Sequence, residues 1–165
     1  MRYSKIRKMD ISNGPGVRVS IFMQGCAFNC KNCFNPETHD FNGGTEFTDD
    51  TINQILDLCD NDQIKGLSIL GGEPMHPNNI EGTTKLAKKF KEKYPEKTVW
   101  SWSGFKFDEY LKDKEVVNYL DVLVDGQYQD DLHDFRLKWR GSSNQRVIDV
   151  QQTLKNNNEI VLFEK

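Results

Sequence analysis

The clearest pattern along the chain is a period of two in residues 17–23, where apolar residues alternate with Arg18, Ser20 and Phe22. The apolar positions that recur every second residue are Val17, Val19, Ile21 and Met23. This period of two predicts a β-strand. Gly25 ends the pattern, so the residues from Cys26 onward are expected to form a loop at the C-terminal end of that strand.

Strand-like and helix-like segments alternate along the rest of the chain. The patterns predict helices at 48–61, 79–93 and 147–157, helical material at 108–119, and further strands at 66–70, 98–102, 121–124 and 159–163. In the first helix, apolar residues recur at i, i+3, i+4 and i+7, and Thr48 or Asp49 is available as the N-cap. Residues 127–146 are polar and aromatic without a clear period, and we expect a long functional loop there.

Strands that alternate with helices indicate parallel strand pairing and right-handed crossovers. Four or five βα units are too few for a closed eight-stranded barrel, which usually takes at least about 200 residues. The expected fold is therefore α/β, with a mainly parallel sheet that forms an open partial (βα) barrel or a wound sheet. Residues 1–165 contain no repeat or linker and are expected to form a single domain.

Composition and charge narrow the function classes. The formal net charge is −3, and 22 basic residues are interspersed with 25 acidic ones, so no basic field is available for direct nucleic-acid binding. Nowhere do 18 apolar residues run together, and the N-terminal residues have no apolar stretch behind their charges. We therefore expect a soluble cytoplasmic protein without membrane association. Of four cysteines three are clustered, which indicates a metal or redox site rather than disulfides.

The clustered thiols are Cys26, Cys30 and Cys33, with C-x3-C-x2-C spacing. Three thiolates this close can share one metal centre. An iron–sulfur cube needs four ligands, so three cysteines leave one iron open to a group that is not protein. The alternative is a structural zinc ion with His39 or Cys59 as the fourth ligand, although zinc sites more often pair two C-x2-C units.

Other turn-forming residues are expected at the same edge of the sheet, because the C-terminal ends of parallel strands gather ligands. The residues that we expect to bind a ligand there are Gly71, Gly72, Glu73, Ser101, Ser103 and Asp125. The two glycines allow close approach of the backbone to a ligand, and the glutamate could orient their turn. The serines could bind a ribose hydroxyl or a carboxylate, or serve only as turn residues, and the aspartate could bind a ligand or cap a turn.

The cysteine spacing after the first strand, followed by Gly71-Gly72-Glu73-Pro74 after the second, resembles the radical S-adenosylmethionine superfamily. Residues 14–18 (GPGVR), 24–26 (QGC) and 33–38 (CFNPET) resemble more narrowly the activases of glycyl radical enzymes. The small size and residues 139–146 (WRGSSNQR) are similar to the branch of activases that acts on anaerobic ribonucleotide reductase. The resemblance extends over nearly the whole chain.

The resemblance implies a [4Fe-4S] cluster on Cys26, Cys30 and Cys33, with S-adenosylmethionine chelating the open iron. One electron from a flavodoxin-like or other low-potential donor then breaks a sulfur–carbon bond of S-adenosylmethionine. The resulting 5′-deoxyadenosyl radical abstracts hydrogen from a glycine of the partner, which is expected to be the large subunit of anaerobic ribonucleotide reductase. No catalytic residue is expected beyond the cluster and its ligands.

Two further sets of residues follow from this interpretation. Superfamily members often carry an aromatic residue just before the third cysteine, where this chain has Asn32, so we expect Asn32 and Phe34 beside the cofactor. The candidates for contacting the partner's loop are Arg18, Arg140, Asn144 and Arg146.

The alternative functions are an activase of another glycyl radical enzyme of the formate-lyase type, a small radical enzyme acting on a heterocycle, or a non-catalytic zinc-stabilised binding module.

Overall fold

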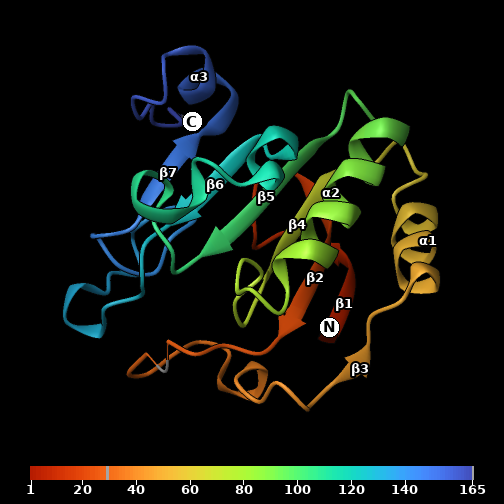
Figure 1. The fold of residues 1–165 in the computed structure, drawn as a ribbon, viewed down its shortest axis with the longest axis horizontal. Coiled ribbons are helices and arrows are strands. Elements are labelled where there is room, and N and C mark those ends of the chain that lie inside the picture. The colour runs from red at the N-terminus through yellow and green to blue at the C-terminus, as the bar shows by residue number, and fades with distance from the viewer. Residues whose placement is uncertain (29, 165) are drawn as a thin grey trace.

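The computed structural model describes residues 1–28 and 30–164, which form a seven-stranded sheet with helices against it (Figure 1). The strands are β1 Arg2–Asp10, β2 Val17–Gln24, β3 Thr45–Glu46, β4 Ile64–Gly71, β5 Thr98–Ser103, β6 Val122–Asp125 and β7 Arg146–Asp149. The α-helices are α1 Asp49–Leu58, α2 Ile80–Lys93 and α3 Val150–Lys155. Shorter helical segments are η1 Pro36–Thr38, η2 Phe107–Leu111, η3 Glu115–Tyr119 and η4 Asp130–Leu132.

The sheet has the strand order β3-β1-β2-β4-β5-β6-β7. Its four central strands, β2, β4, β5 and β6, pair in parallel, while β1, β3 and β7 pair antiparallel with their neighbours. The expected α/β fold with a mainly parallel centre is therefore confirmed. In these pairings β3 and β7 are the two edges of an open sheet, and the curvature of a partial barrel stays a prediction.

The predicted strands at 17–23, 66–70, 98–102 and 121–124 correspond to β2, β4, β5 and β6, and the first two predicted helices correspond to α1 and α2. Of the two expected N-cap candidates, Thr48 is the N-cap of α1, and Asp49 is its first residue. The helical material at 108–119 divides into η2, a π-helical turn, and η3, a 3-10 helix.

The C-terminal predictions were partly wrong. Residues 147–157 were expected to be helical, but Val147 and Ile148 pair with β6 in the strand β7. Asp149 then caps the short helix α3, since its carboxylate accepts a hydrogen bond from Gln152 N at 3.1 Å. The expected strand at 159–163 is reduced, among the described residues, to an isolated bridge between Leu162 and Ile148.

Two strands at the N-terminal side were missed. In β1 the pairing with β2 shifts register between Tyr3 and Lys5 and again between Arg7 and Asp10. Such irregularities interrupt the period of two by which a strand is recognised in a sequence. β3 has only two residues, too few to give a pattern.

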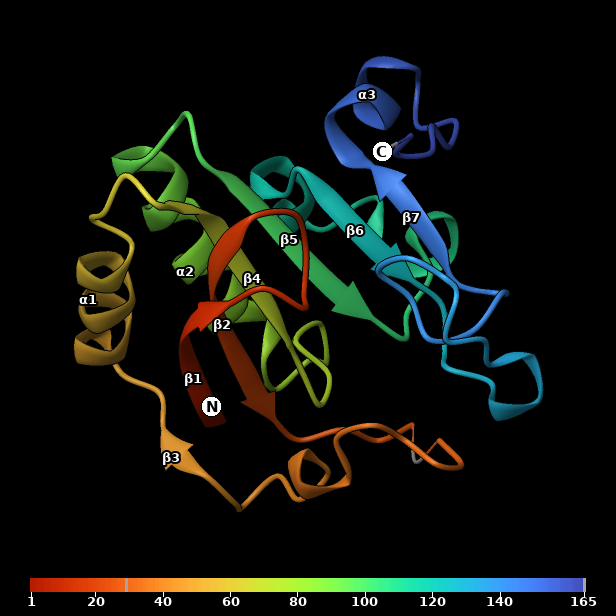
Figure 2. The same ribbon diagram turned by 180° about the vertical axis from the view of Figure 1, so that it is seen from behind.

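The two faces of the sheet differ. Helices α1 and α2 cover one face, where Ile21 and Ile69 pack against Ile55 and Phe90 in the main hydrophobic core (Figure 1). On the opposite face, Figure 2 shows the connection between β1 and β2 folded over the sheet. Within the described part of the chain, none of the helices combines the length and apolar character needed to cross a bilayer.

Candidate functional site

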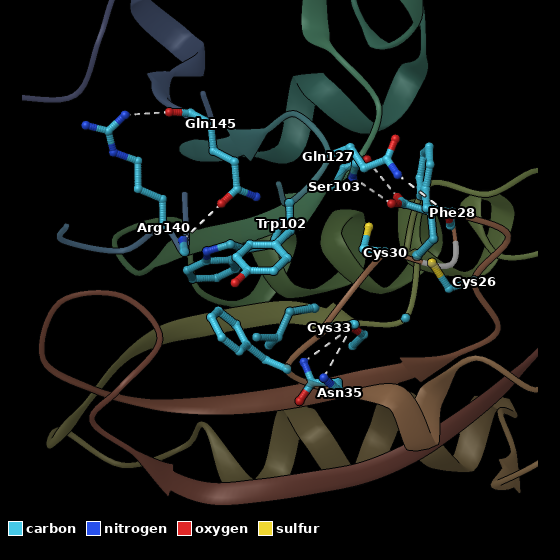
Figure 3. Close-up of a pocket in the computed structure, with 18 of the residues that line it drawn as sticks. Cys26, Phe28, Cys30, Cys33, Asn35, Trp102, Ser103, Gln127, Arg140 and Gln145 are labelled. Carbon is cyan, nitrogen blue, oxygen red and sulfur yellow. Dashed lines mark hydrogen bonds between the residues drawn. The ribbon is translucent and has the colours of Figure 1, made fainter. Parts of the chain in front are cut away.

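A cavity of about 440 Å³ lies at the C-terminal ends of the parallel strands and extends over the face of the sheet that α1 and α2 do not cover. Its lining includes Cys26, Cys30, Cys33, Gly71, Gly72, Glu73 and Ser103. Figure 3 shows the labelled cysteines on one side of this cavity and Arg140 and Gln145 on another. The cysteine loop, the turn at Gly71 and Gly72, the end of β5 at Ser103 and Gly126 after β6 therefore all border one cavity.

The cysteine loop is held by the backbone at both of its ends. Gly25 N donates to Thr38 O at 2.6 Å, and Cys26 N donates to His39 O at 3.2 Å. Within the loop, Asn35 N lies 3.5 Å from Cys33 Sγ as a hydrogen-bond donor. Burial raises the pKa of the Cys33 thiol. The chain thus brings its three clustered thiols to one side of a cavity and provides a backbone donor to one of them.

The chemistry of this donor set fits an iron–sulfur cube. Among residues 1–28 and 30–164, no three His, Cys, Asp or Glu side chains are grouped as ligands of a single metal ion. Three thiols that line one cavity match the protein ligands of a cube that leaves one iron open to a group that is not protein. Cys59, a fourth ligand in the zinc alternative, is fully buried in the core beneath α1 and does not line the cavity.

The glycine turn after β4 is packed closely against the end of β2. Gly72 N donates to Met23 O at 3.1 Å, and Glu73 N donates to Gly25 O at 2.8 Å. Gly71 has a φ of 125°, which side-chain-bearing residues rarely adopt. A Cβ atom on Gly72 would lie 2.6 Å from Gly25 O, so this glycine is required by the neighbouring backbone even before a ligand is considered.

The Glu73 side chain is 1% exposed and joins the ends of β4 and β5. Its Oε2 accepts hydrogen bonds from Ser103 Oγ at 2.7 Å and Met75 N at 3.0 Å, and its Oε1 accepts one from Gly104 N at 2.7 Å. Burial raises the pKa of Glu73 to about 7, although these three donors act in the opposite direction. The carboxyl group therefore orients two turns at the cavity wall.

The structure does not bring the other two strand-end candidates to the cavity. Ser101 is fully buried, and its Oγ donates to Ile69 O at 2.8 Å within the sheet. Asp125 is 1% exposed and accepts hydrogen bonds from Arg146 Nε at 3.0 Å and Nη2 at 2.6 Å. Its Oδ2 also accepts from Phe107 N at 2.8 Å. Neither residue lines the cavity, although Ser103 and Gly126 beside them do.

The four candidates for partner contact also separate into different environments. Arg18 is fully buried at the N-terminal ends of the strands, and Arg146 is paired with Asp125 and with Asp108 at 2.9 Å. Arg140 lines the cavity, and its Nη1 donates to Gln145 O at 2.6 Å. Asn144 lies outside the lining and donates from Nδ2 to Gln127 O at 2.8 Å.

Asn32 and Phe34 connect the cysteine loop to residues 127–146. Asn32 has a φ of 54° and donates from Nδ2 to Asp130 Oδ2 at 2.9 Å. Phe34 lines the cavity, and its ring centroid lies 4.9 Å from that of Tyr128. Of the two, the structure brings only Phe34 to the cavity.

Several residues that shape this site were not among the expected site residues, although Gln24 belongs to the quoted motif at 24–26. Gln24 is buried and donates from Nε2 to Glu37 O at 3.0 Å and to Asp40 O at 2.8 Å, which holds the segment after the cysteines. Asn79 is buried and donates to both Gln24 O at 3.2 Å and Glu73 O at 2.9 Å. The sequence signals that could have identified them are their positions: Gln24 directly precedes Gly25, and Asn79 directly precedes α2.

Arg7 and Trp102 were also missed. Arg7 comes from the unpredicted strand β1 and lines the cavity. Trp102 lines it too, and its Nε1 donates to Trp139 O at 2.7 Å. This bond ties residues 127–146 to the end of β5.

Comparisons with known proteins agree with this site. Residues 12–148 match the protein family described as "4Fe-4S single cluster domain". A relative from Escherichia coli K12, named anaerobic ribonucleoside-triphosphate reductase-activating protein, is 41% identical over 150 residues, which cover 89% of this chain and 97% of that protein.

Relatives with the same name occur in other sources. The one from enterobacteria phage T4 is 39% identical over 147 residues, covering 89% of this chain and 93% of that protein. The one from Vibrio cholerae is 38% identical over 151 residues, which cover 89% of this chain and 97% of that protein. This chain therefore belongs to the 4Fe-4S single cluster domain family and, within it, to the anaerobic ribonucleoside-triphosphate reductase-activating proteins.

Proposed function

We propose that this protein activates an anaerobic ribonucleotide reductase by generating a glycyl radical on the reductase's large subunit. The observation that carries the proposal is the meeting of Cys26, Cys30, Cys33 and the Gly71–Gly72 turn around one cavity. The family match over residues 12–148 and the names of the relatives support the same function.

In this proposal Cys26, Cys30 and Cys33 hold a [4Fe-4S] cluster and S-adenosylmethionine occupies the cavity beside it. When bound, these two groups supply the one-electron cleavage of a sulfur–carbon bond that yields methionine and a 5′-deoxyadenosyl radical. The chain's own residues bind and position: Gly71 and Gly72 bring backbone to the cavity edge, and Glu73 fixes their turn by its bond to Ser103.

The partner must reach this cavity as part of a folded protein, so access matters as much as cofactor binding. An open sheet, curved as part of a barrel within a single domain, suits the entry of a protein loop. Arg140 is the proposed partner contact that lines the cavity. The electron donor is proposed to be flavodoxin-like or another low-potential protein, because cleaving a sulfonium requires a potential near the low end of the range for iron–sulfur clusters.

The test is formation of a glycyl radical on the purified large subunit of an anaerobic ribonucleotide reductase. The protein is reconstituted with iron and sulfide without oxygen, and then mixed with a low-potential reductant, S-adenosylmethionine and the subunit. We expect a glycyl radical signal by electron paramagnetic resonance with the wild type and with Cys59→Ala, and none with Cys30→Ala. Cys59 is the matched control because it is a cysteine that does not line the cavity.

Two outcomes would favour the alternatives. A radical on a formate-lyase-type enzyme but not on the reductase would identify another activase. One zinc ion per chain, with no iron or sulfide retained after reconstitution, would support a zinc-stabilised binding module.

A further inference from the structure

Among the described residues, two cationic side chains line the cavity, those of Arg7 and Arg140. The two differ in what their guanidinium groups already bind. Arg140 Nη1 donates to Ser143 O at 3.1 Å and to Gln145 O at 2.6 Å, so part of its bonding capacity is used within residues 140–146. Within the described part of the chain, the Arg7 guanidinium donates no hydrogen bond and forms no ion pair.

The orientation of Arg7 is nevertheless restricted. Its guanidinium carbon lies 4.9 Å from the ring centroid of Phe22, which is 2% exposed and forms part of the cavity floor. Lys5 Nζ lies over the same ring at 4.7 Å. Cation–π contacts of this kind hold a cation in place without using its N–H donors. The five donors of Arg7 therefore remain available to a ligand.

The acidic residue nearest along the same hairpin does not compete for these donors. Asp10 interacts electrostatically with Arg7, but its Oδ2 accepts from Ser20 Oγ at 2.6 Å and from Asn13 Nδ2 at 2.7 Å. Its Oδ1 accepts from Ser12 N at 2.8 Å. Its hydrogen bonds thus lie within the hairpin, and among the described residues neither Asp10 nor another acidic side chain forms an ion pair with Arg7.

The position of Arg7 along the sheet separates it from the cysteines. It lies over Phe22, which is inside β2, whereas the cysteine loop begins only after β2 ends at Gln24. Arg7 pairs with Ser20, still further from the cysteines. The end of the cavity at Arg7 is therefore available to a part of the partner protein, while the cofactor is held at the cysteine loop.

Resting on the proposed function, we propose that Arg7 binds the partner's glycine-bearing segment by donating hydrogen bonds to its main-chain carbonyl oxygens. A target glycine has no side chain that the activase could recognise, so the backbone of the segment offers the most constant acceptors. A guanidinium presents several N–H groups in a fixed fork and suits two neighbouring oxygens. Arg7 is a substrate-binding residue in this account, and it plays no part in cofactor binding.

The test measures binding and chemistry separately on the cluster-loaded protein. The dissociation constant for the purified reductase large subunit is measured without reductant, and cleavage of S-adenosylmethionine is measured without reductase. For Arg7→Ala we expect the dissociation constant to rise about tenfold or more, because a hydrogen bond to a charged group is lost. Cleavage should stay within about twofold of wild type, and glycyl radical formation should recover at high reductase concentration.

Three further variants make the result specific. Arg7→Met keeps an unbranched side chain over Phe22 without donors and should bind as weakly as Arg7→Ala. Arg7→Lys keeps the charge without the fork and should bind with intermediate strength. Lys8→Ala removes the same charge from the next residue of β1, which does not line the cavity, and should bind like wild type.

An unchanged dissociation constant in both Arg7→Ala and Arg7→Met would overturn the inference. So would a loss of S-adenosylmethionine cleavage in these variants, because it would place Arg7 at the cofactor. A wild type that cleaves S-adenosylmethionine but forms no glycyl radical on the reductase would instead contradict the proposed function. The two failures are therefore distinguishable.

Discussion

The two ends of the parallel strands use polar residues in opposite ways. At the N-terminal ends, Arg18 is fully buried and donates to five oxygen atoms of the surrounding chain. At the C-terminal ends, the cysteines border a cavity that is also lined by Arg7, whose guanidinium donates no hydrogen bond to the described residues. The first end is closed by hydrogen bonds within the protein, and the second presents groups that a ligand can use.

This difference separates a structural arginine from a functional one. Arg18 was expected to contact a partner because it flanks a strand, but it flanks the start of β2, while the ligand-binding edge lies at the strand ends. Its acceptors are Ser68 Oγ, Leu67 O, Pro15 O, Thr98 O and Thr98 Oγ1, at 2.8 to 3.2 Å. Burial lowers the pKa of Arg18 to about 10.

The largest expected effect on stability comes from Arg18→Ala. The change leaves several buried oxygens without donors and opens a cavity, so the free energy of unfolding should fall by about 3–5 kcal/mol. Arg7→Ala breaks no hydrogen bond and loses only the cation–π contact with Phe22, so it should lower the free energy of unfolding by no more than about 1 kcal/mol. Urea denaturation of both variants measures this contrast, and equal losses would remove the distinction between the two ends.

Glu73 should give the cavity end a distinctive pH dependence. Burial raises the pKa of Glu73 to about 7 from an ordinary value of 4.5, so the folded state binds a proton that the unfolded state releases in this range. The contribution of the protonated Glu73 to the free energy of unfolding is complete below pH 4.5 and is lost as the pH rises through 7. The free energy of unfolding should therefore fall by about 3 kcal/mol over this range.

Glu73→Gln should remove this slope. The measurement is the free energy of unfolding at several pH values between 4.5 and 7 for the wild type and the variant. Parallel curves for the two proteins would show that Glu73 titrates normally and that burial does not control its charge.

Gly72→Ala tests the close packing of the turn at the cavity end. The added Cβ would lie 2.6 Å from Gly25 O and 2.8 Å from Thr38 O, both of which are backbone atoms that cannot move aside alone. We expect a loss of about 1–3 kcal/mol in the free energy of unfolding. Gly82→Ala is the matched control, because it lies within α2 and meets the flexible side chain of Met1, so helix propensity should make it neutral or stabilising.

The smallest expected effect concerns the tie between the cysteine loop and residues 127–146. Asn32→Ala loses the hydrogen bond to Asp130 and places alanine at a φ of 54°, which should cost about 1 kcal/mol. Asn32→Gly loses the same bond but accepts this φ, so it should cost less. Thermal denaturation compares the two, and equal losses would assign the whole effect to the hydrogen bond.

The sequence predicted central strands such as β2 because apolar residues, among them Val19 and Ile21, recur at every second position. Both of these residues are fully buried in the core. It predicted the meeting of the cysteine loop with Gly71 and Gly72 because parallel strands end at one edge. It did not predict β1, whose register shifts break the period of two, and so it missed Arg7.

Local patterns also could not show which polar residues are satisfied internally. Asp125 and Arg146 both flank strand ends, yet they bind each other, and only the pairing of β6 with β7 brings them together. Ser101 and Ser103 both occur at the end of β5, but only Ser103 lines the cavity. Contacts between residues distant in sequence decide such cases, and a single sequence does not contain them.

The most direct test of the account is electron paramagnetic resonance on the iron- and sulfide-reconstituted, reduced protein, with and without S-adenosylmethionine. The account predicts a [4Fe-4S] signal that changes when S-adenosylmethionine is added, because three cysteines leave one iron open to it. A cluster signal that does not respond, or a protein that forms no cluster, would contradict the assignment of this cavity as the cofactor site.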